Sequence, residues 1–168
     1  DFIVPDTREG WVKLLEYTLR GAFYKDDMQE MSYSTQLVRS EGALIKGFGG
    51  VASGPEILCK GIGQISEVLM NRAGKQLRPI DCLDIMNIIG SIVVAGNVRR
   101  SAQIAIGDCD DMQFLKAKNW SSGKIPEWRS NSNNSVVCNN INHLPEEFWK
   151  TYDGNGEPYG LINLKLSR

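Results

Sequence analysis

The sequence predicts an α/β fold built around parallel strands. Segments with the 3.6-residue periodicity of amphipathic helices alternate with segments of strand composition, in the order helix, strand, helix, helix, strand, helix, strand, helix, strand. Strands separated by helices favour parallel pairing, because a parallel neighbour requires a crossover that returns the chain to the same end of the sheet. The chain has 168 residues, of which 42% are hydrophobic, so it can bury the core of one ordinary domain.

The first part of the chain predicts a helix, a strand and a glycine-rich section. Asp6 stands three residues before Glu9, the spacing of a capping box, and predicts the start of an amphipathic helix that ends between residues 21 and 27. The apolar stripe of this helix consists of Trp11, Leu14, Leu15, Leu19 and Ala22. Residues 32–38 have the Tyr, Thr and Val content of a strand. The glycines between residues 39 and 54 indicate a backbone that turns tightly or approaches another group closely.

Two prolines predict the starts of the next two helices. Pro55 and Pro79 each suit the first helical position, because the N–H group that proline lacks would have no helical partner there. The stripe of the first of these helices consists of Ile57, Leu58, Gly61, Ile65, Val68 and Leu69. The second is apolar on most of its surface, so we expect it to be covered on two sides. Its expected buried side consists of Leu83, Met86, Ile89, Gly90 and Val93.

The last part of the chain predicts short strands and short helices. Residues 101–107 alternate at the period of a strand, and Asp110 or Asp111 can cap a short helix that extends to Trp120. Residues 121–134 are rich in turn formers, residues 135–138 have the composition of a short strand, and Pro145 predicts the start of a helix. Residues 159–168 are an apolar run without a polar tail, and we expect the chain to be a piece of a longer protein.

Charge and hydropathy exclude several classes of function. The 19 basic and 20 acidic residues give a net charge of -1, so no overall basic field holds nucleic acid or an anionic membrane. No apolar run reaches the roughly 18 to 20 residues that span a bilayer, and residues 1–9 lack the features of a signal peptide. We therefore expect a cytoplasmic protein that binds neither nucleic acid nor membrane.

The potential metal ligands predict no metal site. The four cysteines, which are Cys59, Cys82, Cys109 and Cys138, stand singly, and His143 is the one histidine. This spacing does not fit structural zinc, and single thiols on apolar stripes are interpreted as small core residues rather than as nucleophiles. Asp108, Asp110 and Asp111 could bind Mg²⁺, but helix capping is the simpler interpretation of these aspartates.

Two loops could bind an anionic ligand. Residues 47–54 lead into a helix N-terminus, whose free amides attract phosphate, but they lack the ending of a Walker loop and do not complete G-x-G-x-x-G; a plain turn is the alternative. Residues 94–102 include a permissive Gly96, the amide of Asn97 and two cations, Arg99 and Arg100. Adjacent residues of an extended segment point apart, so at most one arginine grips a phosphate or base; a solvated surface pair is the alternative.

Three motifs carry a resemblance to a known family. RSEGALIKGFGG at residues 39–50, AGNVRRSAQI at residues 95–104 and NSNNSV at residues 131–136 are similar to motifs of the catalytic subunit of ribonucleotide reductases. The subfamily that the chain resembles most is the monomeric, adenosylcobalamin-dependent ribonucleoside-triphosphate reductases. The resemblance covers nearly the whole chain, and three motifs in the same order are more specific than one glycine-rich loop.

The resemblance implies a fold, a function and a set of site residues. The fold would be a segment of a ten-stranded α/β barrel, with residues 1–168 forming an incomplete part of one barrel domain. The full enzyme would bind adenosylcobalamin and make 2'-deoxyribonucleotides for DNA replication by thiyl-radical chemistry, with a reductant of the thioredoxin type. Its loops would bind a deoxynucleotide effector and adjust the choice of ribonucleotide substrate. The positions matching effector-binding residues are Asp6, Arg39, Ile45 and Lys46, and those matching the specificity loop on the substrate side are Gly96, Asn97, Val98, Arg99, Arg100 and Ser101.

The same resemblance implies that this chain carries no catalytic residue. The radical-bearing cysteine of the family would follow Arg168, and the first cysteine of its reducing pair would precede Asp1, so none of the four cysteines matches either position. The chain alone would be inactive and would depend on the remaining segments of the reductase. Arg100 and Ser101 take the place of glycines found in many relatives. Two alternatives remain: a stand-alone nucleotide-binding regulatory module without catalysis, and an unrelated α/β domain whose loops are structural.

Overall fold

The computed structural model describes residues 1–24, 32–45, 49–95, 101–152 and 160–167. The helices are α1 (Arg8–Phe23), α2 (Pro55–Met70), α3 (Pro79–Val94), α4 (Met112–Leu115) and α5 (Glu146–Thr151), and the strands are β1 (Phe2–Ile3), β2 (Tyr33–Ser34), β3 (Gln103–Asp108), β4 (Ser132–Cys138) and β5 (Gly160–Asn163). The chain divides into two compact units, and each is described by itself. The first unit holds residues 1–77 and 91–100, and the second holds residues 78–90 and 101–168.

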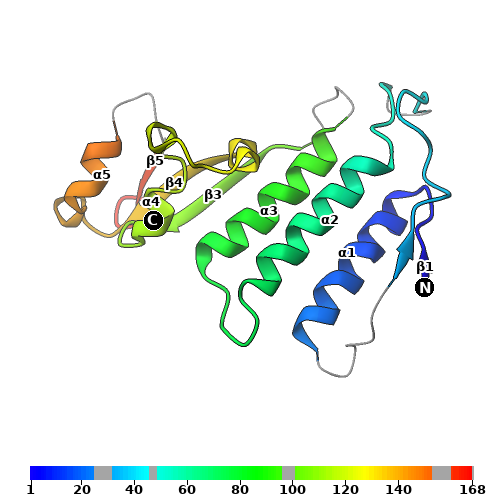
Figure 1. The fold of residues 1–168 in the computed structure, drawn as a ribbon. Coiled ribbons are helices and arrows are strands. Elements are labelled where there is room, and N and C mark those ends of the chain that lie inside the picture. The colour runs from blue at the N-terminus through cyan, green and yellow to red at the C-terminus, as the bar shows by residue number, and fades with distance from the viewer. Residues whose placement is uncertain (25–31, 46–48, 96–100, 153–159, 168) are drawn as a thin grey trace. The chain divides into compact units, whose positions relative to one another are not determined.

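In the first unit, two helices pack beside a short parallel strand pair (Figure 1). β1 pairs with β2 in parallel, with Phe2 opposite Tyr33 and Ile3 opposite Ser34. Helix α2 begins at Pro55, as the sequence predicts, and it buries Leu58, Ile62, Ile65 and Leu69. Helix α1 contributes only Leu14 of its predicted stripe as a fully buried side chain. These elements position the segment between β2 and α2, which contains the first predicted loop.

The second unit contains a parallel sheet in the order β3-β4-β5 (Figure 1). Gln103 pairs with Ser132 at one end of β3, and Asp108 pairs with Val137 at the other. One face of the sheet packs on the helices. Gly107 allows this packing, because a Cβ atom there would stand 2.4 Å from Cδ1 of Phe114 in α4. The core of the unit consists of Ile80, Leu83, Cys109, Phe114, Leu115, Ala117, Val136, Cys138, Leu144 and Phe148.

The other face of this sheet exposes apolar side chains. Ile104 and Ile106 lie on the same side of β3 and are 74% and 58% exposed. Parallel sheets usually have both faces covered, because their crossover connections place helices over them. This face of the unit is therefore unusual for a parallel sheet.

Buried polar groups join α3 to the sheet within the second unit. Asp84 of α3 accepts hydrogen bonds from Nε of Arg129 at 2.6 Å, from Nη2 of Arg129 at 2.7 Å and from Nε1 of Trp128 at 2.9 Å. Nη1 of Arg129 donates to the carbonyl of Ala117 at 3.0 Å. The segment that leads into β4 is thereby fixed against α3.

Several predictions about single positions are wrong. Met86 and Val93 of α3 are 54% and 40% exposed, because the buried face of this helix includes the polar residues Asp84 and Asn87 instead. Cys82 is exposed rather than a core residue. Strand β4 begins at Ser132, three residues before its predicted start. Among the helices in the described part of the chain, none combines the length and apolarity needed to cross a bilayer.

Candidate functional site

Two of the predicted effector-binding residues form an ion pair. Nε of Arg39 donates to Oδ2 of Asp6 at 2.5 Å, and Nη1 of Arg39 lies 3.5 Å from the carbonyl oxygen of Leu44. The side chains of Arg39 and Asp6 are 39% and 29% exposed. The contact therefore joins residues 33 positions apart at the surface of the first unit, where a polar ligand has access.

Asp6 is available for this pairing because a neighbouring residue caps the helix. The N-cap of α1 is Thr7, whose hydroxyl accepts a hydrogen bond from the amide of Gly10 at 3.0 Å. The predicted capping role of Asp6 is thus wrong by one residue. A threonine satisfies the free amide as well as an aspartate does. The carboxylate of Asp6 consequently points to Arg39 instead of to the helix.

The first loop is a narrow two-stranded arm. The amide of Gly42 donates to the carbonyl of Ala52 at 2.9 Å, and Leu44 and Val51 form an antiparallel bridge. Gly42 has φ of 83°, a left-handed conformation that glycine adopts without a steric penalty. The amide of Ile45 donates to the carbonyl of Gly50 at 3.2 Å, and the side chain of Ile45 is half-buried. Lys46 lies outside the described residues.

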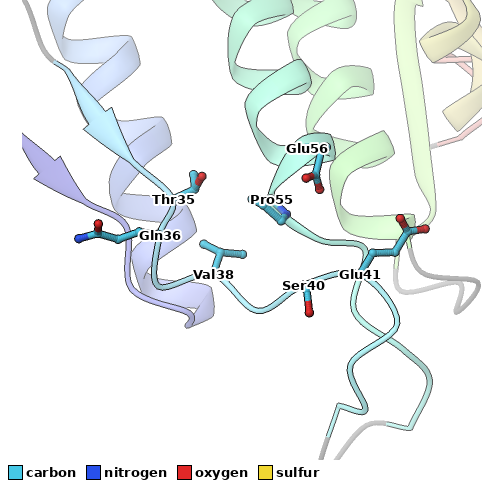
Figure 2. A pocket seen from close by; sticks show the side chains of 7 residues that line it. All are labelled: Thr35, Gln36, Val38, Ser40, Glu41, Pro55 and Glu56. Atoms are coloured by element: carbon cyan, nitrogen blue, oxygen red, sulfur yellow. The ribbon is translucent and has the colours of Figure 1, made fainter.

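A cleft of about 530 Å³ lies between this arm and the start of α2. Figure 2 shows Pro55 and Glu56 at the first turn of α2, with Ser40 and Glu41 on the segment that leads into the arm. The remaining lining residues are Thr35, Gln36 and Val38. Neither Asp6 nor Arg39 lines this cleft, and its two ionisable groups are carboxylates.

The described residues at the start of α2 bear on the choice between a phosphate loop and a plain turn. Glu56 lies in the first helical turn, where a carboxylate interacts favourably with the positive end of the helix dipole. A Cβ atom at Gly54 would stand 2.6 Å from Oε2 of Glu56 and 3.2 Å from the amide nitrogen of Glu41. A phosphate at this position would meet the carboxylate of Glu56. For this helix terminus, the geometry therefore favours the turn interpretation over the phosphate-loop interpretation.

The second predicted loop is visible only at its two ends. Residues 96–100, which include Gly96, Asn97, Val98, Arg99 and Arg100, lie outside the described residues. Ser101 is half-buried and lies two residues before the start of β3. A shared site for effector and substrate requires Ile45 and Arg99 to lie on the same side of the molecule, and this stays a prediction.

Three of the four cysteines and the acidic cluster lie in the second unit. Cys109 and Cys138 are buried, and burial raises the pKa of the Cys109 thiol, with Asp110 and Asp108 adding to the effect. A buried thiol with a raised pKa is a poor nucleophile, since the thiolate is the reactive form. Asp111 caps α4 by accepting from the amides of Gln113 and Phe114, as the sequence predicts. 

A second cleft, of about 270 Å³, contains the residues with metal-ligating side chains. Asp108, Cys109 and Asp110 hold ligand atoms within 4.8 Å of one another, and His143 also lines this cleft. An acidic cluster of this kind is common at the surface without a metal. The raised pKa of Cys109 also opposes the deprotonation that metal binding by a thiol requires.

Comparison with known proteins identifies similar sequences along most of the chain. The family model described as the insertion domain of B12-dependent ribonucleotide reductase matches residues 1–69. An adenosylcobalamin-dependent ribonucleoside-triphosphate reductase of Lactobacillus delbrueckii subsp. bulgaricus is 42% identical over 168 residues, which is 98% of this chain and 22% of that protein. The enzyme of the same name from Lactobacillus helveticus is 42% identical over 172 residues, with the same coverage of 98% and 22%.

A solved structure supports the same relationship. A crystal structure of a B12-dependent (class II) ribonucleotide reductase is similar to this chain, with a TM-score of 0.67 and 36% sequence identity. The similarity covers 82% of this chain and 19% of that one. The chain thus spans about a fifth of the length of the relatives that it matches.

Proposed function

We infer that the chain belongs to the B12-dependent ribonucleotide reductase family, and on that premise we propose that it forms the regulatory and substrate-selecting part of such an enzyme. The full protein would convert ribonucleoside triphosphates to 2'-deoxyribonucleotides. In this proposal, the first unit holds a deoxynucleotide effector, and residues 96–101 pass its identity to the substrate. The observation that carries the proposal is the ion pair of Asp6 and Arg39, since both match effector-binding positions of the family.

The geometry of the pair suits a nucleotide with a sugar and a phosphate. A carboxylate accepts hydrogen bonds from sugar hydroxyls or base amino groups, and a guanidinium donates to phosphate oxygens. Arg39 is 39% exposed, so it can exchange Asp6 for a phosphate without unfolding its surroundings. Lys46 and Ile45 would add a second cation and an apolar contact. The two carboxylates at the 530 Å³ cleft argue that the triphosphate lies on the Arg39 side of the arm rather than in that cleft.

Residues 96–101 would act on base choice through hydrogen bonding. An arginine and an amide on a backbone that contains a glycine can change partners with a small movement. Leaving a polar base edge unpaired costs about 1 to 3 kcal/mol, which is enough to change the preferred substrate. By linkage, an effector biases the substrate only as far as it binds the two loop arrangements with different affinity.

We also propose that the sheet of the second unit is part of a ten-stranded α/β barrel. All described strand pairs within the two sheets are parallel, as one half of such a barrel requires. The exposed Ile104 and Ile106 fit a sheet face that further segments of the full protein cover.

The residues that the structure describes do not fit a cobalamin site. The two described clefts, of about 530 and 270 Å³, are small and polar for a corrin ring and its nucleotide, and His143 is the one imidazole in the sequence. We therefore propose that the cofactor, the radical-bearing cysteine and the contact with a thioredoxin-type reductant belong to other segments of the full protein.

Calorimetric titration of the full-length protein with each dNTP tests the effector site. We expect Asp6→Ala and Arg39→Ala each to weaken binding of the preferred dNTP about 10- to 100-fold, the range for losing a hydrogen bond to a charged group. Lys13→Ala is the matched control, because it also removes one positive charge from the first unit but breaks only contacts within α1 at the surface, which are the pair with Glu16 and a cation–π contact with Tyr17. The control is expected to bind dNTPs as the wild type does.

Two outcomes would contradict the proposal. Equal affinities of the wild type and both variants would remove Asp6 and Arg39 from the effector site. Binding of dNTPs by a full-length protein that reduces no ribonucleotide would favour a regulatory module without catalysis.

A further inference from the structure

Side chains from the starts of two strands bind consecutive carbonyls of α3. Nε2 of Gln103, the first residue of β3, donates to the carbonyl of Met86 at 2.8 Å. Nδ2 of Asn131, which directly precedes β4, lies 3.3 Å from the carbonyl of Asn87 and also donates to the carbonyl of Trp128 at 2.9 Å. Because β3 and β4 are paired neighbours, both contacts attach the same end of the sheet to one turn of α3.

Gly90 provides the space that the side chain of Gln103 occupies. A Cβ atom at Gly90 would stand 2.9 Å from Nε2, 3.1 Å from Cδ and 3.2 Å from Oε1 of Gln103. The carboxamide therefore lies flat against the helix backbone, where any larger residue would displace it. Since the atoms in contact are the end of a flexible side chain, an alanine at this position moves Gln103 and leaves the helix backbone in place.

The bond connects the two ends of the segment that contains the specificity loop. Met86 lies near the middle of α3, Gly90 lies one turn further on, and Gln103 follows Ser101 by two residues. The contact is therefore made across the connection between α3 and β3, with 17 positions between the bonded residues. It fixes the start of β3, two residues after Ser101, against residues 86–90 of α3.

We propose that Gln103 is a positioning residue for substrate selection, and that Gly90 is required for it to act. The inference rests on the proposed function, because it assigns Gln103 an effect on the ribonucleotide through residues 96–101. With the bond in place, the loop changes hydrogen-bond partners from a fixed base. Without the bond, the start of β3 gains freedom, and the two effector-selected arrangements differ less in affinity for each substrate.

The test measures all four ribonucleotide reductions by the full-length enzyme, with and without each dNTP. Gln103→Leu keeps the size of the side chain and removes its donor, whereas Gly90→Ala keeps Gln103 and removes its space. We expect each variant to reduce the effector-dependent change in relative kcat/KM by roughly two- to tenfold, the range for one neutral hydrogen bond. On the substrate that each variant affects least, kcat is expected to stay close to the wild-type value.

Two matched variants control for the substitutions themselves. Gln113→Leu makes the same change at an exposed residue of the second unit that takes part in capping α4 only through its backbone. Gly63→Ala replaces a glycine of α2 whose Cβ position is free of neighbours within 4 Å. Both are expected to retain wild-type specificity. Alanine favours a helix interior over glycine, so Gly90→Ala is expected to keep or raise the melting temperature, which separates positioning from folding.

The outcomes distinguish this inference from the proposed function. If the wild type itself shows no effector-dependent change in substrate preference, the proposed function fails. If the dNTPs change the substrate preference of the wild type, and change that of Gln103→Leu and of Gly90→Ala by the same amount, only the role of Gln103 fails. The double variant is expected to resemble either single variant, since both remove the same bond; additive effects on specificity would contradict a shared contact.

Discussion

Removing the carboxylate of Asp84 is predicted to destabilise the second unit strongly. Asp84 accepts three hydrogen bonds, two of them from the Arg129 guanidinium, and the two side chains are only 11% and 14% exposed. Asp84→Ala leaves a positive charge in this environment with one remaining bond, to the carbonyl of Ala117. Breaking a buried pair in this way costs roughly 3 to 5 kcal/mol. Residual exposure lets water reach the guanidinium, so we expect about 3 kcal/mol, at the lower end of that range.

The assay is urea denaturation followed by tryptophan fluorescence, since Trp128 contacts Asp84 directly. Lys150→Ala is the matched control: Lys150 pairs with Glu146 in α5 of the same unit at 3.1 Å, and the two side chains are 59% and 83% exposed. Surface pairs contribute about 0 to 1 kcal/mol, so the control is expected to lose no more than that. An Asp84→Leu/Arg129→Met double variant is expected to recover much of the loss, because no charge is left unpaired. A cost for Asp84→Ala no larger than that of Lys150→Ala would refute the reasoning.

Two further predictions concern the packing of the same unit and its behaviour at alkaline pH. Gly107→Ala is expected to lower the free energy of unfolding by about 1 to 3 kcal/mol in thermal unfolding, because its methyl group would overlap the ring of Phe114. Gly21→Ala is the control, because a Cβ atom there meets nothing within 4 Å. Equal stabilities of the two variants would contradict the close packing of Gly107 on Phe114. The pKa of Cys109 is raised by burial above its ordinary value of 9.0, so its contribution to stability is complete below pH 9 and is lost as the pH rises through the folded-state pKa. When stability is measured from about pH 8 to about pH 11, a range that starts below the ordinary pKa of a thiol, Cys109→Ala is expected to show a shallower alkaline decline than the wild type. Identical slopes would contradict this.

Features with a local physical cause are predictable from the sequence. Pro55 and Pro79 begin α2 and α3 as expected, because the fixed φ angle and missing N–H group of proline act within one turn. The alternation in residues 101–107 predicts the strand β3, but its apolar side chains Ile104 and Ile106 lie on the exposed face of the sheet and not on the core face. The parallel arrangement also follows from local order, because a helix separates most of the strands.

Features that depend on distant partners were not predictable. Ser132 and Asn134 are buried strand residues because Ser132 donates to the side chain of Asn134 and its carbonyl accepts from Lys118, a contact across 14 positions. In the sequence, Asp84 stands in an apolar helix and nothing nearby indicates its partner, because Arg129 lies 45 positions away. At the candidate site, the motif resemblance indicated Asp6 and Arg39, but the periodicity argument assigned Asp6 to the helix cap that Thr7 provides.

The measurement that tests the central claim most directly is reduction of the four ribonucleotides by the full-length enzyme carrying Arg99→Ala. Each substrate is assayed alone and with each dNTP, and kcat/KM is compared with that of the wild type. If residues 96–101 transmit the effector's identity, the variant loses base selection while retaining turnover on its least affected substrate. An equal loss on all four substrates, with the effector-dependent preference intact, would contradict the claim.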